Sequence, residues 1–383
     1  MRRSSLAAFA GIFVVTLLSL TAVGAVLPVL PRYVKGPLES GNVAVGIVVG
    51  AFAFTGIGAR PLAGRLADRR GRRPTVVVGS LLAASAGLLY LVPAGVPGLI
   101  GARLVLGLGE GAVFTAGSAW IVDLAPVNRR GRVIGLYGLA VWSGLSVGPS
   151  LGELLYRAAG FDLVWAFAAA APFLAALVAL RIPDRFRPQA EARGPLIARE
   201  SIRPGSALSM ASVGYAAMAS FIVLHLRANG DSHGAVAFTV FAATVVLTRL
   251  VAGDLPDRVG PLRCAAGAAA VESSGLAVIA LANTLALAIV GAAAMGAAFS
   301  LLYPSLSLVV VNRVAEARRG AALGTFTGFF DLGVGLGAPL AGTAAALGGY
   351  PAAFWLGSVS ALGTLGLALA LRRAVAAPAP ATG

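Results

Sequence analysis

Four ionisable side chains lie inside long apolar stretches of the sequence, where an unpaired charge is costly and therefore indicates a function. Arg103 and Glu110 lie about two helical turns apart in one stretch and share a helix face. Asp331 and Glu272 lie in two later stretches. We expect these four residues to carry protons or to bind a charged part of a substrate. The alternative is that these residues have structural roles. Arg103 would then form hydrogen bonds to a neighbouring backbone, and Asp331 would cap a helix or lie at a solvated helix end.

A charged segment, Gly-Arg-Leu-Ala-Asp-Arg-Arg-Gly-Arg-Arg, begins at Gly64 after the second apolar stretch. Gly64 permits close contact between helices, and Gly71 permits a tight turn. Asp68 can accept hydrogen bonds, and Arg72 can form a bidentate pair with a carboxylate. The segment therefore predicts a charged latch at one membrane surface. For the other arginines, Arg69 among them, the alternative is that they only set the topology and face water and lipid headgroups.

A stripe of small residues marks another stretch, in which Gly144, Gly148 and Gly152 recur at every fourth position. Such a spacing places the three glycines on a single helix face that a second helix can approach closely. Pro149 removes a backbone hydrogen bond from the same helix and bends it. We expect these four residues to form a flexible, closely packed seam near the contact between two parts of the protein.

Membrane-spanning helices must position these residues, because the composition excludes an ordinary soluble protein. The 383 residues are 58% hydrophobic and 12% charged, with a mean hydropathy of +0.87, whereas soluble domains are about a quarter charged. A spanning helix needs roughly 20 apolar residues. The sequence predicts twelve of them, at 7–29, 42–62, 74–93, 97–122, 133–156, 161–180, 205–226, 234–253, 264–283, 286–311, 321–346 and 351–371.

The sequence also repeats itself, with residues of the same type recurring at a constant offset of 189 positions. One offset shared by many pairs predicts two halves with the same fold and the same orientation. We therefore expect six-helix bundles over 1–181 and 205–383, joined by a charged, proline-containing cytoplasmic linker over 182–204. The matched pairs include Arg60 and Arg249, Asp68 and Asp257, Gly71 and Gly260, Gly107 and Gly296, and Gly148 and Gly337.

The formal net charge of +15 reflects membrane topology rather than nucleic-acid binding. Most of the 30 lysines and arginines fall in segments that a cytoplasmic amino terminus would place inside the cell; Arg32, Lys35, Arg157 and Arg227 fall outside. This bias predicts a multi-pass protein of the inner membrane with both termini in the cytoplasm. The lone cysteine, Cys264, excludes an internal disulfide, and no metal-ligand pattern is present.

The segment from Gly64 to Arg73 resembles the signature loop between helices two and three of the major facilitator superfamily, and the resemblance covers essentially the whole chain. It implies that Asp68 and Arg72 latch the cytoplasmic side, with Asp123 as the acidic partner. The Arg103 stretch resembles a second family motif, which is associated with proton coupling. The seam with Gly144 resembles that of the twelve-helix drug:proton antiporters, although Glu153 replaces the last glycine of their pattern. The stretches 27–34 and 330–342 look like those of bacterial arabinose-efflux-type permeases.

We therefore expect a secondary active transporter and not an enzyme. In this reading a proton gradient drives the export of a small organic molecule by alternating access, with no cofactor, and the protein is a monomer in the lipid bilayer. The helices expected around the cavity offer Tyr215 and Tyr303 among small apolar residues, which favours an uncharged or amphipathic substrate. An importer of the same fold is the alternative, and a membrane sensor that transports nothing is a third reading.

Overall fold

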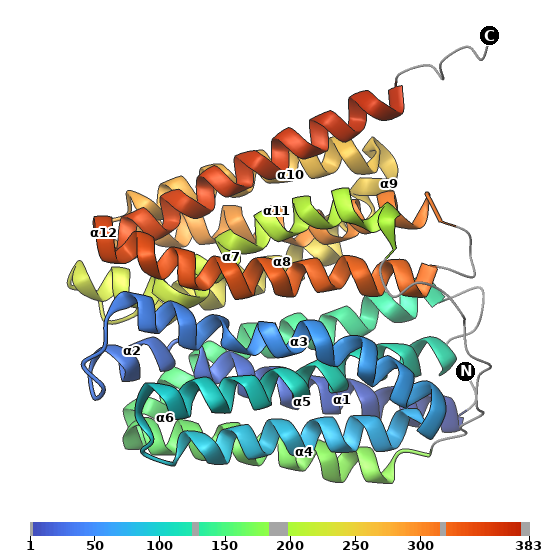
Figure 1. The fold of residues 1–383 in the computed structure, drawn as a ribbon, viewed down its shortest axis with the longest axis horizontal. Coiled ribbons are helices and arrows are strands. Elements are labelled where there is room, and N and C mark those ends of the chain that lie inside the picture. Colours follow the sequence, from blue (N-terminus) through green and yellow to red (C-terminus); the bar gives the residue numbers. More distant parts are fainter. Residues whose placement is uncertain (1–2, 125–129, 184–197, 315–318, 377–383) are drawn as a thin grey trace.

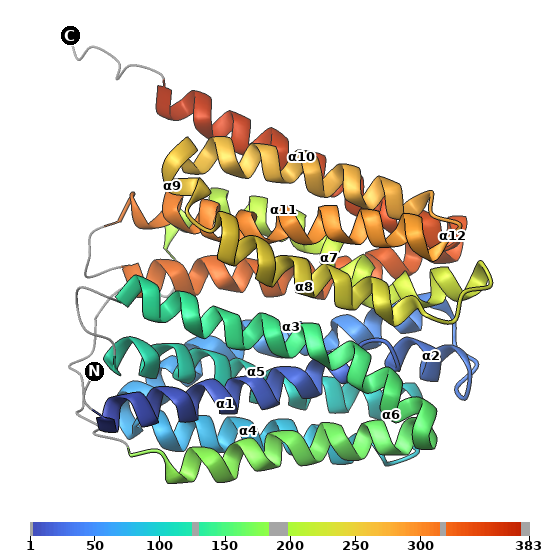
Figure 2. The same cartoon turned by 180° about the vertical axis from the view of Figure 1, so that it is seen from behind.

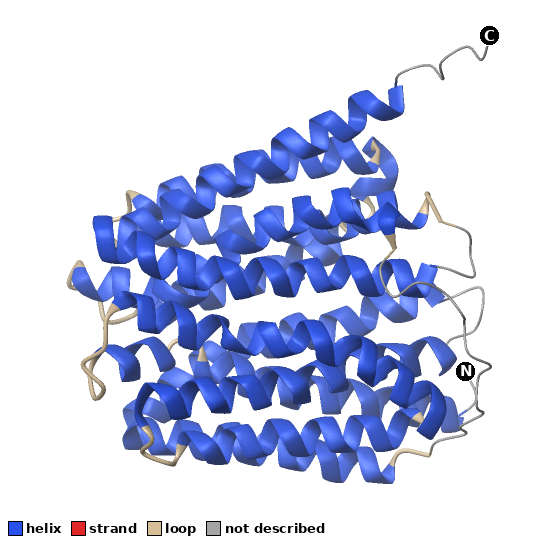
Figure 3. Ribbon diagram, in the orientation of Figure 1, coloured by secondary structure: helices blue, strands red, loops and turns tan. Residues whose placement is uncertain are grey.

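The computed structural model describes residues 3–124, 130–183, 198–314 and 319–376, and it forms only helices and loops over these ranges (Figure 3). The fold prediction of an all-helical membrane protein is confirmed. The helices are α1 (Arg3–Val26), α2 (Leu30–Lys35), α3 (Asn42–Arg70), α4 (Arg72–Tyr90), α5 (Gly95–Leu124), α6 (Arg130–Arg181), α7 (Ile202–Ala228), α8 (Gly234–Ala252), α9 (Leu255–Val259), α10 (Pro261–Ala280), α11 (Leu285–Val311) and α12 (Arg319–Ala376), with a short 3-10 turn at Arg199–Ser201.

Two of these helices are long enough to cross a membrane twice. Among the described residues ten helical segments are apolar enough to span, and those at Tyr137–Arg181 and Ala322–Arg373 contain 45 and 52 residues. Each has a break, at Ala159 and Gly160 in α6 and at Gly348 and Gly349 in α12. Gly160 and Gly349 have φ of 73° and 74°, which glycine adopts at little cost. Divided at these breaks, the ten segments correspond to the twelve predicted helices.

The repeat is visible in the backbone as well as in the sequence. Gly160 and Gly349 are 189 positions apart, and so are Gly71 and Gly260, whose φ values are 108° and 89°. Gly71 separates α3 from α4, and Gly260 separates α9 from α10. The same turn therefore recurs at the same place in both halves.

The first span extends beyond the predicted helix over 7–29 and consists of two helices. α1 ends at Val26, a turn covers residues 27–29, and α2 continues to Lys35. Pro28 and Pro31 explain the break, since neither can donate a backbone hydrogen bond to the preceding turn. Most of the predicted linker over 182–204 lies outside the described residues, and its last residues already belong to α7.

The helices gather into two groups, α1 to α6 and α7 to α12, seen from opposite sides in Figures 1 and 2. α3 of the first group lies beside the first part of α12, and α6 contacts α8. α1 begins and α12 ends on one side of the molecule, while α2 lies on the other (Figure 1). We call these the terminal side and the α2 side.

Among the described residues, one hydrophobic cluster joins the two halves, and it lies towards the α2 side. This cluster joins residues of α2 and α3, such as Leu30 and Val48, to residues of α7 and α12, such as Phe221 and Phe354. Towards the terminal side each half has a cluster of its own, one formed by helices α1 to α6 and the other by residues from Ala198 to Ala368. The protein is therefore closed on the α2 side, with the halves packed together there.

Candidate functional site

A buried ion pair joins the two halves in the middle of the molecule. The Arg60 guanidinium of α3 donates to both carboxylate oxygens of Asp331 in α12, with Nε–Oδ2 at 2.5 Å and Nη2–Oδ1 at 3.0 Å. The side chains are only 10% and 1% exposed. Gly56, one turn before Arg60, lies next to the carboxylate, since a Cβ there would be in ordinary contact with Oδ2 at 3.5 Å. Asp331 of the carboxyl-terminal half thus contacts the amino-terminal half.

Sequence reasoning identified Asp331 but not its partner. Arg60 entered only as one member of the repeat, although it is an intramembrane arginine of the kind that indicates a function. Its guanidinium also lies over the Phe114 ring of α5, 5.0 Å from the ring centroid. The position of Arg60 within a long apolar stretch was the available signal. The repeat alone does not show which helices of the two halves meet.

Arg103 and Glu110 share a helix face but have different surroundings. Arg103 is fully buried, donates to the backbone oxygens of Val48 at 3.2 Å and Val49 at 2.6 Å, and lies over the Phe52 ring. These contacts tie α5 to α3, which matches the structural alternative for Arg103. Glu110 is partly exposed and interacts electrostatically with Arg60 and Asp331. Glu110 therefore belongs to the charged site between the halves.

Glu272 lies apart from this charged site. It is in α10, where it is fully buried, and neither carboxylate oxygen has a hydrogen-bond partner in the part of the chain that the structure describes. The structure does not bring it to Arg60 and Asp331, with which we had grouped it on grounds of residue type.

The predicted latch residues come together within the amino-terminal half. Arg72, at the start of α4, pairs with Asp68 of α3 and with Asp123 of α5, the latter at 3.1 Å. Gly71 provides the turn between α3 and α4, and Gly64 and the exposed Arg69 belong to the last turns of α3. In this state the charged cluster connects three helices of one half on the terminal side.

The glycine face of α6 packs inside its own half rather than against the other one. A Cβ at Gly144 would lie 2.9 Å from the Leu17 oxygen, and one at Gly148 would lie 2.6 Å from the Gly24 Cα. Gly152 approaches Ala25 in the same way, so that α6 and α1 touch along their backbones. Pro149 is buried in this helix. The seam is closely packed as predicted, but its partner is α1.

Other residues of α6 make the contact between the halves. Ser150 and Thr239 of α8 are joined by a hydrogen bond of 2.9 Å between their hydroxyls. Trp142 packs edge-on against Phe241 of α8 and Phe299 of α11, with centroid distances of 6.4 and 5.7 Å. The indole is partly exposed and so is Phe330 of α12.

These rings belong to an aromatic cluster beside the charged site. Tyr215 of α7 stacks on Phe299, with ring centroids 5.7 Å apart, and also contacts Phe330, the residue before Asp331. Phe241 and Trp142 complete the cluster, which we define by these five residues. Tyr303, the other predicted aromatic contact, instead shares a hydrogen bond with Thr327 and packs against Phe326.

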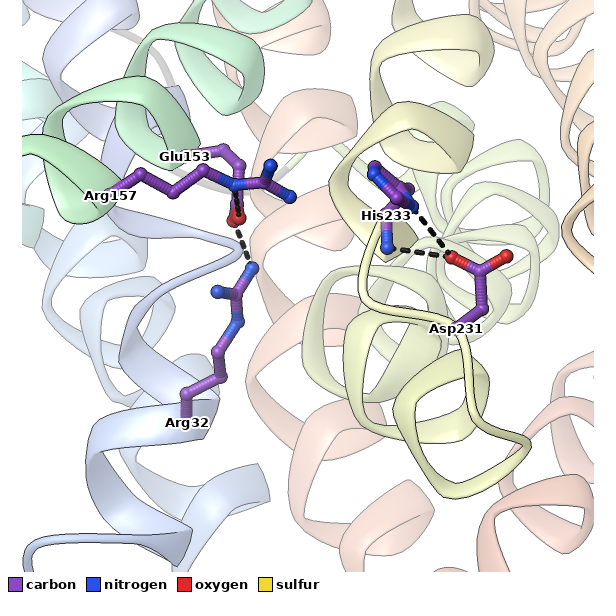
Figure 4. A network of polar contacts seen from close by, with 5 residues as sticks. All are labelled: Arg32, Glu153, Arg157, Asp231 and His233. Carbon is purple, nitrogen blue, oxygen red and sulfur yellow. Dashed lines mark hydrogen bonds and ion pairs between the residues drawn. The ribbon is translucent and has the colours of Figure 1, made fainter.

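A second ionic cluster lies on the α2 side (Figure 4). Arg32 of α2 pairs with Glu153 of α6, and Glu153 also accepts from Arg157 at 2.8 Å. The Arg32 and Glu153 side chains are 6% and 14% exposed. Glu153 is the residue that replaces glycine in the antiporter pattern, and the replacement supplies the partner of a buried arginine. His233 and Asp231, between α7 and α8, form a separate pair (Figure 4).

Comparisons with known proteins agree with this architecture. A model of the Major Facilitator Superfamily matches residues 12–226 and again 204–383. An uncharacterised MFS-type transporter of Salmonella typhimurium (strain LT2) is 34% identical over 90% of this chain and 91% of its own length. A second uncharacterised MFS-type transporter, from Burkholderia mallei (strain SAVP1), is 32% identical over 93% of this chain and 90% of its own.

Solved structures show the same fold at low sequence identity. The nucleoside transporter NupG has a TM-score of 0.77 and 15% identity, with 97% of this chain and 100% of that one covered. The human organic anion transporter MFSD10 has a TM-score of 0.74 and 18% identity, with 95% and 99% covered. With the family model matching both halves and relatives above 30% identity over nearly the full length, the chain belongs to the Major Facilitator Superfamily and is an MFS-type membrane transporter.

Proposed function

We propose that this transporter exports a small organic molecule in exchange for protons, by alternating access between its two halves. The single observation that carries the proposal is the Arg60–Asp331 pair. It is buried, it crosses between the halves, and it has a second carboxylate, Glu110, in its electrostatic range. A proton delivered to Asp331 would neutralise one partner of the pair, and thereby link proton binding to the contact between the halves.

The proposed cycle uses the closed α2 side as one of its two states. In this state α3 and the first part of α12 are held together from Asn42, whose amide donates to the Ala345 oxygen at 3.0 Å, to Arg60. Protonation of Asp331 weakens the inner end of this contact and favours opening of the α2 side. We infer that the Asp68–Arg72–Asp123 cluster then latches the terminal side, as the family resemblance implies.

The direction of transport is inferred from the first part of α6, which is the predicted helix over 133–156. Its closely packed glycine face resembles that of drug:proton antiporters, and this supports export over import. We further propose that the chain works as a monomer in the inner membrane, with the terminal side in the cytoplasm and without a cofactor or a nucleic-acid partner. The excess of basic residues in the segments on that side supports this orientation.

The proposed substrate is an uncharged or amphipathic compound with a flat apolar part. The aromatic cluster supports this class, because stacked rings offer a flat apolar surface. In the buried pair beside them, the positive group of Arg60 is compensated by the negative group of Asp331. Trp142 comes from the amino-terminal half, whereas Tyr215, Phe299 and Phe330 come from the carboxyl-terminal half. A substrate bound there would contact both halves.

Inverted membrane vesicles that contain the overexpressed protein test this proposal. A library of aromatic amphipathic drugs and of sugars is added to vesicles with an acidic lumen, and a pH-sensitive dye reports the lumenal pH. For an antiporter, a transported compound accumulates in the lumen while protons leave it, and Asp331→Asn abolishes both effects. Accumulation that needs no pH gradient, or that persists unchanged in Asp331→Asn, contradicts the proposal. An importer would fail to accumulate its substrate against a gradient in these vesicles.

A further inference from the structure

The carboxyl group of Glu272 is isolated inside the carboxyl-terminal half. It lies near the middle of α10, fully buried, and both oxygens lack a hydrogen-bond donor among the described residues. The next residue, Ser273, is bonded to Ser358 of α12 through their hydroxyls at 3.0 Å. α10 is therefore fixed against α12 at this level, and the Glu272 side chain lies in a closed junction between helices.

Gly214 of α7 leaves space for this carboxyl group, and Gly357 of α12 packs closely against Gly214 and Leu276. A Cβ at Gly214 of α7 would lie 3.1 Å from Glu272 Oε1 and 2.6 Å from Leu276 Cδ1. A Cβ at Gly357 of α12 would lie 3.0 Å from the Gly214 Cα and 3.3 Å from Leu276 Cδ1. The absence of a side chain at Gly214 thus leaves room for the carboxyl, beside the apolar side chain of Leu276.

No charged partner reaches this junction. The titratable and charged groups on the helices packed against α10 are Arg203, Tyr215, His225 and Arg227 of α7, Asp257 and Arg258 of α9, Tyr303 of α11, and Arg319, Asp331, Tyr350, Arg372 and Arg373 of α12. None of them interacts electrostatically with Glu272 in the described part of the chain. His225 instead contacts the Ile279 oxygen, and Asp331 pairs with Arg60. An ionised carboxylate would therefore be buried here with neither counter-ion nor donor, a state so costly that such groups lose their charge.

We propose that Glu272 is a proton-binding site of the carboxyl-terminal half, separate from the Arg60–Asp331 pair. The group keeps its proton while α7, α10 and α12 are packed together, and it ionises only when they separate. The two buried acids thus differ in their surroundings: Asp331 is paired with an arginine, whereas Glu272 has no partner among the described residues and is, in this proposal, a neutral acid at neutral pH. This inference concerns protonation and does not depend on the direction or substrate of transport.

Thermal unfolding of the purified full-length protein in detergent tests the site through its pH dependence. Glu272→Gln replaces the neutral acid with a neutral side chain of the same shape. In the unfolded wild-type chain Glu272 ionises above about pH 4.3, whereas the folded protein keeps the proton, so unfolding releases a proton and wild-type stability falls as the pH rises. Relative to the Gln variant, the folding equilibrium of the wild type should weaken by about tenfold per pH unit above that value.

Asp162→Asn provides the matched control, because Asp162 is an exposed carboxylate in the same membrane protein. Its stability should follow that of the wild type at every pH. A difference between Glu272→Gln and the wild type that does not change with pH would show that Glu272 is ionised in the folded protein and would overturn the proposal. Failure of the Gln variant to fold would overturn it as well, since the variant preserves the proposed neutral form.

Infrared spectroscopy gives an independent measurement. At neutral pH the wild type should show the carbonyl band of a protonated carboxylic acid, which disappears in Glu272→Gln and remains in Asp331→Asn. An identical band in wild type and Glu272→Gln contradicts the proposal. If Asp331→Asn loses proton-coupled transport while this band is unchanged, Asp331 and Glu272 bind protons independently of each other.

Discussion

The two contacts between the halves occupy equivalent positions in the repeat but are built differently. Along α3 and α12 the backbones touch: a Cβ at Gly50 would lie 3.3 Å from the Pro339 ring, and one at Gly342 would lie 2.6 Å from the Asn42 oxygen. At the offset of 189 residues, Gly50 corresponds to Thr239 and Gly342 to Glu153. Along α6 and α8 polar side chains therefore replace close backbone packing.

The same contrast holds for the charged residues. Arg60 pairs with Asp331, whereas its equivalent, Arg249, donates to the Ser300 oxygen of its own half at 2.8 Å. The position equivalent to Asp331 is Trp142, an aromatic residue that packs between the halves. The repeat thus gives both halves the same arrangement of helices. Among the described residues, the buried ion pair between the halves occurs in the α3–α12 contact and has no equivalent in the α6–α8 contact. We interpret the α3–α12 contact as the proton-sensitive one, and the α6–α8 contact as the aromatic and polar one.

The largest effect is expected from the ion pair. Asp331→Ala leaves Arg60 buried without a counter-ion and should lower the free energy of unfolding by about 3–5 kcal/mol. The double variant Arg60→Met with Asp331→Leu removes both charges and should recover most of that loss, while the pH dependence of transport stays abolished. Chemical unfolding in detergent measures the energies. A double variant as unstable as the sum of the two single variants would contradict the buried-pair interpretation.

The cluster on the α2 side should give the next largest effect. Glu153→Gln deprives the buried Arg32 of its carboxylate and should cost about 1.5–3 kcal/mol of unfolding free energy. Arg157→Gln is the control, because the Arg157 side chain is 50% exposed and exposed pairs contribute about 0–1 kcal/mol. Both values come from the same unfolding assay. Equal losses in the two variants would show that Glu153 acts through the exposed arginine instead.

Backbone packing along α3 and α12 can be tested by exchanging equivalent residues. Gly46 lies against the Ala338 backbone, so the added methyl group of Gly46→Ala forces the helices apart and should cost about 1–3 kcal/mol. Its equivalent in the other contact is already alanine, Ala235. Ala235→Gly should cost only about 0.5–1 kcal/mol, the ordinary penalty of glycine in a helix. The comparison fails if Gly46→Ala is as stable as the wild type.

The smallest effect is expected from the hydroxyl pair in the α6–α8 contact. Ser150→Ala removes one hydrogen bond to Thr239 and should cost about 0.5–1 kcal/mol, because the site is exposed. Ser274→Ala serves as the control, since Ser274 is exposed and bonds only to the Ala270 oxygen of its own helix. Melting temperatures measured side by side resolve the difference. A larger loss than that of Gly46→Ala would reverse the ranking of the two contacts.

The sequence predicted the fold well, because its signals are local. Long apolar runs determined the helices, and the breaks expected between 156 and 161 and between 346 and 351 lie at Gly160 and Gly349, where φ is positive. The continuation of the first span as α2, after the turn at residues 27–29, was not predicted, because the prediction ended the helix at residue 29. Pro28 and Pro31 carried that information, and proline alone does not distinguish a kink from a break.

The candidate site was only partly predictable, because its contacts are between helices far apart in the sequence. The spacing of Gly144 and Gly148 shows a small face but not that α1 covers it. Asp331 could be singled out as a buried acid, yet its partner Arg60 lies 271 residues away. For Arg103, residue type could not decide between proton transfer and bonding to a neighbouring backbone. Its contacts with Val48 and Val49 favour the second.

The position of Asp331 also has a consequence for the synthesis of the protein. Arg60 is on α3, the second span to be made, whereas Asp331 is on α12, near the end of the chain. During translation α3 therefore enters the membrane with a guanidinium whose counter-ion has not yet been made. Until α12 arrives, Glu110 of α5 is the carboxylate within its electrostatic range. We therefore expect Glu110 to become available to Arg60 during synthesis before Asp331, which arrives only with α12.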